Sequence, residues 1–98
     1  MGIIIVKRTP EFIQWFDDVK DGIFKKKFNN RIERIQQGNF GSHKRLNEYL
    51  YELKFVSGKG HRVYYVISDN MIILWGGVKD GQSKDVKKAN IILQQYME

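Results

Sequence analysis

The stretch that decides the fold is residues 49–75, which read YLYELKFVSGKGHRVYYVISDNMIILW. Three runs rich in aromatic and β-branched residues are separated by two short turn sequences, SGKG at 57–60 and SDN at 68–70. Apolar runs bounded by Gly, Ser, Asn and Asp are typical of β-strands joined by tight turns. Because strands joined by turns of three or four residues run antiparallel, this stretch predicts three consecutive antiparallel strands.

The first two runs alternate, so each predicted strand has two distinct faces. In the first strand the faces are Tyr49, Tyr51, Leu53 and Phe55 against Leu50, Glu52, Lys54 and Val56, and in the second Arg62, Tyr64 and Val66 against His61, Val63, Tyr65 and Ile67. The third run, MIILW at 71–75, is apolar throughout, which predicts a central strand covered on both faces.

The segment before this stretch predicts one strand and two helices. GIIIVKR at 2–8 is a short apolar run typical of a buried strand, and Thr9 followed by Pro10 is a helix start. Asp21 and Gly22 separate the first helix from a second one over residues 23–37. The apolar residues at helical spacing are Phe12, Trp15, Phe16 and Val19 in the first helix and Phe24, Phe28, Ile32 and Ile35 in the second.

The remaining segments predict a loop and a last helix. Residues 38–48, GNFGSHKRLNE, are rich in Gly and Asn and are expected to form a loop. After Gly76 and Gly77 and a polar loop, a helix begins at Gln82 or Ser83. This helix has Asp85 in its first turn and is expected to turn Val86, Ala89, Leu93 and Tyr96 inward.

The element order is therefore β-α-α-β-β-β-α, and 98 residues with 42% hydrophobic content make one domain, residues 1–98. This order predicts an α+β fold with a curved, mainly antiparallel four-stranded sheet. Two helices are expected on one face and the third at an edge or a side.

Charge and composition narrow the classes of function. The net charge is +6, and residues 25–62 hold ten basic and three acidic side chains, a net +7, so the excess lies mid-chain. This suits a polyanion such as nucleic acid; a solvated basic helix is the alternative. Without cysteine, disulfides and thiolate metal sites are excluded, and the apolar run 3–6 is too short for a signal peptide or membrane span. We expect a cytoplasmic protein without a membrane partner.

A polar cluster on the two strands around SGKG could act on a phosphodiester. Its predicted members are Glu52, Lys54, Arg62 and Tyr64, with Lys79 and Gln82 following the neighbouring strand. Cations for phosphate oxygens and a group that moves a proton are what such a reaction needs. The alternative is an exposed sheet face with ordinary cross-strand pairing. Alternation turns His61 away from Arg62, and the two histidines, His43 and His61, do not make a metal-ligand set.

Several motifs together resemble one family. YELKFVSGKGHRVYYV at 51–66, IILWGGVKDGQSKDVKKA at 72–89 and GNFGSHK at 38–44 are similar to the RelE/ParE superfamily of toxins from type II toxin–antitoxin systems. The closest branch is that of the addiction-module killer proteins, near the HigB-type toxins. The chain departs from that pattern at Lys54, where arginine is usual, at His61, where tyrosine is usual, and at Val78, where an acid is usual.

The resemblance implies a metal-independent and cofactor-free endoribonuclease that cleaves messenger RNA, commonly on the ribosome. The ribose 2′-hydroxyl would attack the adjacent phosphorus and leave a cyclic phosphate and a free 5′-hydroxyl. By motif match, Arg62 would neutralise the transition state with Lys54 and Lys79. Proton transfer would fall to Glu52, His61 or Tyr64. The residues implied in RNA binding are Lys25, Lys26, Lys27, Lys44, Arg45, Lys59 and Gln82.

The resemblance also implies a cognate antitoxin, of the helix-turn-helix DNA-binding kind, that silences the toxin. Two other functions remain open from the sequence. The first is a ParE-like toxin, which would poison DNA gyrase without a nuclease site. The second, which the three departures keep open, is an inactive module that binds nucleic acid or antitoxin.

Overall fold

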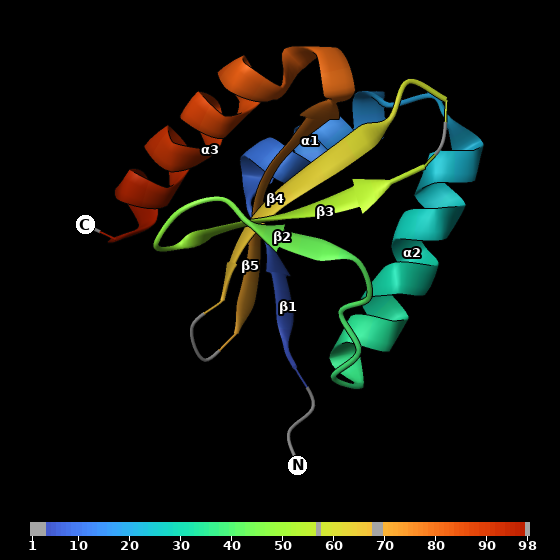
Figure 1. The fold of residues 1–98 in the computed structure, drawn as a ribbon, viewed down its shortest axis with the longest axis horizontal. Coiled ribbons are helices and arrows are strands. Elements are labelled where there is room, and N and C mark those ends of the chain that lie inside the picture. The colour runs from blue at the N-terminus through green and yellow to red at the C-terminus, as the bar shows by residue number, and fades with distance from the viewer. Residues whose placement is uncertain (1–3, 57, 68–69, 98) are drawn as a thin grey trace.

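The computed structural model describes residues 4–56, 58–67 and 70–97, which form a sheet with helices on both faces (Figure 1). The elements are β1 Val6–Arg8, α1 Pro10–Asp18, α2 Gly22–Gln36, β2 His43–Arg45, β3 Leu50–Phe55, β4 His61–Ile67, β5 Met71–Val78, a 3₁₀ turn Lys79–Gly81 and α3 Gln82–Met97. The five strands are ordered β1-β5-β4-β3-β2. β1 runs parallel to β5, and every other neighbouring pair is antiparallel. The α+β class is confirmed, with a mixed sheet of five strands.

The predicted four-stranded sheet was wrong by one strand, β2, which lies within the expected loop 38–48. All three β2 residues are exposed and polar, so no apolar alternation marks them as a strand. They are held by pairing at the sheet edge, with His43 opposite Leu53 and Lys44 opposite Glu52. A short, charged edge strand is a common way for proteins to end a sheet without exposing an apolar edge.

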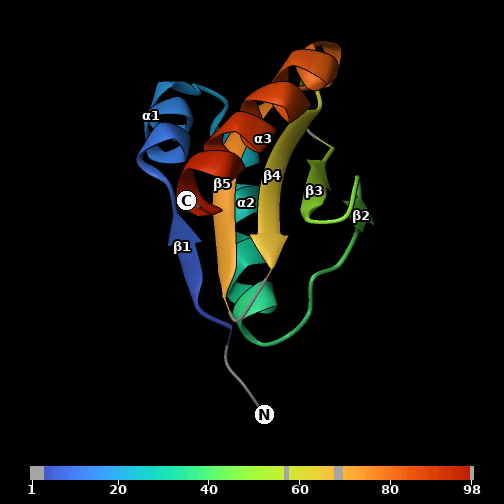
Figure 2. The same cartoon turned by 90° about the vertical axis from the view of Figure 1, so that its left-hand side faces the viewer.

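The two faces of the sheet carry separate apolar cores. The core between the sheet and helices α1 and α2 contains Phe12, Phe24, Phe28, Ile32, Ile35, Leu53, Phe55, Val63, Tyr65, Met71 and Ile73. The core between the sheet and α3 contains Leu50, Tyr64, Val66, Leu74, Ala89, Ile92 and Leu93. Alternation in β4 and the coverage of β5 on both faces are thereby confirmed. The third helix covers the face opposite α2, not an edge of the sheet (Figure 2), and its Tyr96 is 51% exposed rather than inward.

Both helix starts follow from their capping residues. The Thr9 hydroxyl accepts a hydrogen bond from the Phe12 N–H at 3.0 Å and donates one to the Leu74 carbonyl at 2.8 Å. Asp21 Oδ1 accepts from the N–H groups of Ile23 and Phe24, at 3.0 and 3.1 Å, as the acceptor at a helix N-terminus should. Thr9 therefore caps α1 and also ties it to β5.

Gly76 and Gly77 lie inside β5, although the sequence placed them after the strand. The six-membered ring of Trp15 lies against Gly76 from one face, and the Asp85 carboxylate lies against Gly77. A side chain at either position would occupy space that these groups already fill, so the strand continues only because both residues are glycine.

Some predictions fall outside the described residues. These are the first residues of the expected strand 2–8, Ser57 of the first turn, and Ser68 and Asp69 of the second. Among the described residues, no helix combines the length and the apolar character that crossing a membrane requires.

Candidate functional site

A cleft of about 300 Å³ opens over the polar face of β3 and β4, beside the edge strand β2 and the start of α3. Its lining residues are Ser42, His43, Lys44, Glu52, Lys54, Arg62 and Gln82. Register explains why they meet, since Lys44 lies opposite Glu52 and Lys54 opposite Arg62. Four of the six residues of the predicted polar cluster therefore line one cavity.

Glu52 forms the centre of this cleft, and 2% of its surface is exposed. Arg62 Nη1 donates to Glu52 Oε1 at 3.0 Å, and Gln82 Nε2 donates to Glu52 Oε2 at 2.8 Å. Each carboxylate oxygen thus has one donor, from β4 on one side and from the start of α3 on the other. Glu52 fixes the positions of both donors relative to the sheet.

The two cations that face each other across β3 and β4 differ in setting. The Arg62 side chain is 11% exposed, whereas Lys54 is exposed. Arg62 Nε has no hydrogen-bond partner among the described residues. Arg62 therefore has a buried donor without a partner, and Lys54 adds an exposed cation at the rim of the cleft.

Tyr64 lies on the same face of the sheet but does not line the cleft. Burial, with smaller contributions from the Glu52 and Asp85 carboxylates, raises the pKa of Tyr64 well above its ordinary value. Its hydroxyl has no hydrogen-bond partner within the described part of the chain. The Tyr64 phenol is neutral and packs under α3. It therefore does not lie at the cleft surface, where a proton donor would have to be.

The two histidines lie in different surroundings. His61 is 6% exposed, stacks on Phe24 with ring centroids 4.3 Å apart, and has Nδ1 3.9 Å from Asp21 Oδ2. Alternation predicted that His61 faces away from Arg62, and this is confirmed. His43 is exposed, lines the cleft, and its Nδ1 lies 2.7 Å from the Tyr65 hydroxyl. Its ring therefore lies on the α2 side of the sheet, with Leu53 and Tyr65, and not on the face that carries Glu52 and Arg62.

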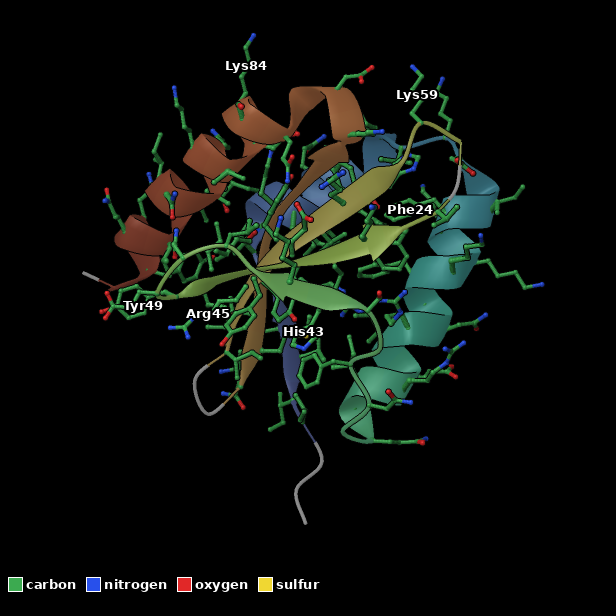
Figure 3. All side chains as sticks on the ribbon, in the orientation of Figure 1. Phe24, His43, Arg45, Tyr49, Lys59 and Lys84 are labelled. Atoms are coloured by element: carbon green, nitrogen blue, oxygen red, sulfur yellow. The ribbon has the colours of Figure 1, made fainter. Side chains whose placement is uncertain are left out.

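The basic residues implied by the resemblance are dispersed. Lys44 lines the cleft, but Lys59 lies at the tip of the β3–β4 hairpin (Figure 3) and Lys79 follows β5, next to Gly60. Arg45 donates from Nε and Nη2 to the carbonyls of Asn47 and Glu48 at 3.0 and 3.1 Å, so its guanidinium is held by its own loop.

Helix α2 divides its lysines between two directions. Lys25 Nζ lies 5.1 Å from the centroid of the Phe16 ring, and Lys26 is exposed. Lys27 Nζ donates to the Val56 carbonyl at 2.6 Å. Of the three, Lys27 is bonded to the segment that follows β3, and none of the three lines this cleft.

A second cleft, of about 480 Å³, lies between α2 and β3. Its lining residues are Lys27, Asn30, Arg31, Arg34, Ser42, Lys54, Phe55 and Val56. Ser42 and Lys54 line both clefts, so the two clefts adjoin at these residues. The sequence reasoning did not assign Arg31 and Arg34 to a site, although the spacing 27, 31 and 34 places three cations on one face of a helix.

Asp85 lies in the first turn of α3, and the effect of burying its carboxyl can be tested by measuring stability at different pH values. Burial raises the pKa of its carboxyl, although Trp75 Nε1, which donates to Asp85 Oδ1 at 3.1 Å, acts in the opposite direction. A carboxyl with a higher pKa in the folded chain than in the unfolded chain binds protons better when folded, so its contribution to stability falls as pH rises between the two values.

We therefore expect the Asp85→Asn variant to gain free energy of unfolding relative to the parent as pH rises from about 4 to about 7. Urea unfolding of both proteins across this range measures the difference. A difference that is flat, or that favours the parent as pH rises, would show that the positive end of α3 outweighs the burial of this carboxylate.

Within the described residues, no group of three or more His, Asp or Glu side chains is placed to hold a metal ion.

Comparison with known proteins gives one relative. An uncharacterized protein of Haemophilus influenzae is 39% identical over 94 residues, which cover 94% of this chain and 95% of that protein. No family model and no solved structure matches the chain. The similarity extends over almost the whole of both chains, so it includes the strands and helices that form both clefts.

Proposed function

The chain belongs to one family with the Haemophilus influenzae protein, and we propose that it is a RelE/ParE-type toxin, an endoribonuclease that cleaves messenger RNA without a metal ion. The observation that carries this proposal is the pairing of Lys54 and Arg62 at one cleft, with Glu52 beneath them. Two cations from neighbouring strands suit a phosphate group, and a buried carboxylate holds one of them in place.

In the proposed reaction the 2′-hydroxyl of the substrate attacks the adjacent phosphorus while the bond to the 5′-oxygen breaks. The products are a 2′,3′-cyclic phosphate and a 5′-hydroxyl, and the proton lost by the nucleophile balances the proton gained by the leaving oxygen. Arg62 and Lys54 stabilise the additional negative charge on the non-bridging oxygens. Gln82 lies on the far side of Glu52 and bounds the phosphate position.

Proton transfer in this reaction needs a group at the cleft surface. Among the three side chains considered from the sequence, Glu52 lines the cleft, whereas His61 lies under α2 and Tyr64 under α3. His43 borders the same cleft, but its ring lies on the opposite face of the sheet, where Nδ1 is 2.7 Å from the Tyr65 hydroxyl. Of the three candidates, the proposal therefore keeps Glu52 for proton transfer and sets His61 and Tyr64 aside.

The biological setting belongs to the same proposal. A ribonuclease of this kind acts in the cytoplasm, on messenger RNA at the ribosome, and is silenced by a cognate antitoxin with a helix-turn-helix DNA-binding domain. The alternative is a module that binds without cleaving. It is favoured by the small exposed fraction of the Arg62 side chain, 11%, and by its ion pair with Glu52, which both limit access of a phosphate.

Expression of the parent and of Arg62→Lys, followed by primer extension on abundant transcripts, tests the nuclease. The variant keeps a charge opposite Glu52 but lacks the planar fork of arginine, so we expect the yield of new 5′ ends to fall by at least about tenfold. Lys54→Gln, on the exposed partner, is expected to lower the yield less.

Two other outcomes would reject the nuclease. Growth arrest without new 5′ ends but with blocked DNA replication would indicate a gyrase poison. Growth without arrest, while the chain accumulates in folded form, would indicate a binding module.

A further inference from the structure

We propose that the cleft between α2 and β3 binds the sugar-phosphate backbone of single-stranded RNA that continues from the cleaved phosphate, and that three neighbouring rings stack its bases. This assignment deepens the proposed function and rests on it. The backbone contacts are Lys27, Arg31 and Arg34 from α2 with Lys54 from β3, and the rings are Phe40, His43 and Tyr51.

The charge of the cleft calls for an anion. Four cations line it, no acidic residue does, and within residues 4–56, 58–67 and 70–97 none of the four forms an ion pair. Lys27 donates to the Val56 carbonyl, and Arg31 Nη1 donates to the Ser42 carbonyl at 3.3 Å. These bonds use one donor of each side chain and leave the positive charges uncompensated.

Arg31 and Arg34 lie on successive turns of α2, where like charges destabilise a helix. Burial, together with the neighbouring charge of Arg34, lowers the pKa of Arg31. The Arg31 guanidinium also lies 4.8 Å from the centroid of the Phe55 ring, so it is held in place against an apolar surface. A phosphate between the two guanidiniums would relieve their repulsion and use donors that are already oriented.

The rings beside the cleft identify the anion as a nucleic acid with unpaired bases. Phe40 and His43 stack with centroids 5.4 Å apart, and His43 and Tyr51 stack at 5.8 Å. His43 is exposed and lies between the half-buried Phe40 and Tyr51, so the middle of the series is open to solvent. Aromatic faces accept any base in a single strand, whereas an acidic peptide would gain little from them and a duplex hides its base faces.

The path of the strand follows from shared residues. Ser42 and Lys54 line both clefts, and the His43 ring, next to Ser42, lies on the α2 side of the sheet against Tyr65. A strand whose cleaved phosphate lies at Arg62 can therefore continue past Lys54 to Arg34 while its bases face His43. The labelled view shows Lys59 and Lys84 at another part of the surface, away from His43 (Figure 3), so neither lies on this path.

Binding is measured by fluorescence anisotropy with a labelled single-stranded RNA of about 12 nucleotides whose riboses are all 2′-O-methylated. This probe has no attacking hydroxyl, so binding is read without cleavage. The Arg31→Gln/Arg34→Gln variant should bind at least about tenfold more weakly and lose about 1.4 from the slope of log K against log salt concentration. Lys84→Gln/Lys87→Gln removes the same charge from α3, at two exposed residues, and should bind within about threefold of the parent.

A second variant keeps the result interpretable if Arg31 proves necessary for folding. Arg34→Glu changes an exposed residue whose side chain forms no hydrogen bond or ion pair among the described residues, and it should weaken binding as much. His43→Ala should weaken binding of single-stranded RNA by about tenfold. Equal loss in the α3 control, tighter binding of duplex RNA, or equal competition by a polyglutamate peptide would each overturn the assignment.

The two proposals can fail separately. If no new 5′ ends appear with the parent while RNA binding depends on Arg31 and Arg34, the nuclease fails and the RNA site stands. If cleavage depends on Arg62 while the α2 variants bind and cleave like the parent, the RNA site fails and the nuclease stands.

Discussion

Replacement of Gly76 by alanine is expected to lower the free energy of unfolding by about 3 kcal/mol, the upper end of the usual range for overpacking. A Cβ built on Gly76 would overlap three atoms of the Trp15 six-membered ring, and the position itself is buried. Such an overlap with ring atoms can be relieved only if the ring or the strand moves.

The Trp15 ring has little room to move. It contacts Phe12 at a centroid distance of 5.7 Å, Phe24 at 5.9 Å and His61 at 6.5 Å. Moving the indole would therefore disturb the core that joins α1 and α2 to the sheet. Moving β5 instead would stretch its pairing with β4, where Gly76 lies opposite Val63.

Chemical denaturation of Gly76→Ala and of a matched Gly22→Ala variant measures this effect. Gly22 is exposed, is the first residue of α2 and has no atom within 4 Å of a built Cβ. The same change there should be neutral or stabilise by up to about 1 kcal/mol. If both variants unfold at the parent's denaturant concentration, the close packing of Trp15 on β5 is absent in solution.

The sequence predicted the elements whose side chains repeat with a period. Alternation correctly placed Arg62 and His61 on opposite faces of β4. Successive β4 residues pack alternately under α1 and α2 on one face and under α3 on the other. The capping residue Thr9 likewise predicted the start of α1, since a hydroxyl before Pro10 is a local signal. Local chemistry and period were sufficient in both cases.

Features that depend on distant parts of the chain were not predictable. β2 is a strand because β3 pairs with it, and its own residues carry no apolar alternation. Gly76 and Gly77 were read as a break, because nothing local indicates that Trp15 and Asp85 would fill the space beside them. The sheet's fifth strand and the extent of β5 both required the tertiary arrangement.

The candidate site also has one part that the sequence predicted and another that it did not. Glu52, Lys54 and Arg62 were grouped correctly, since strand alternation and a short turn determine which residues face together. The neighbouring cleft was missed, because it forms where α2 passes β3 and depends on helix placement rather than on pattern. His43 lines the cleft only because β2 pairs with β3.

The second large effect is expected at the buried ion pair. Arg62→Met should lower the free energy of unfolding by about 3–5 kcal/mol, because it leaves the Glu52 carboxylate without its cation. Glu52 is 2% exposed, and Gln82 would then be its remaining donor. Lys54→Met, at the exposed position opposite Arg62, should change stability by less than about 0.5 kcal/mol.

The double variant Glu52→Gln/Arg62→Met separates the structural role of Arg62 from its proposed chemical role. It contains no unpaired buried carboxylate, so most of the stability lost in Arg62→Met should return. Urea unfolding of the parent, the two single variants and the double variant gives the coupling free energy. If the double variant is as unstable as Arg62→Met, the loss comes from packing of the arginine stem instead. If it folds and still produces no new 5′ ends in cells, absence of cleavage is due to the loss of the Arg62 guanidinium and the Glu52 carboxylate and not to unfolding. Restored cleavage in this variant would mean that Arg62 and the Glu52 carboxylate serve the fold alone, and the nuclease proposal would then have to rest on Lys54.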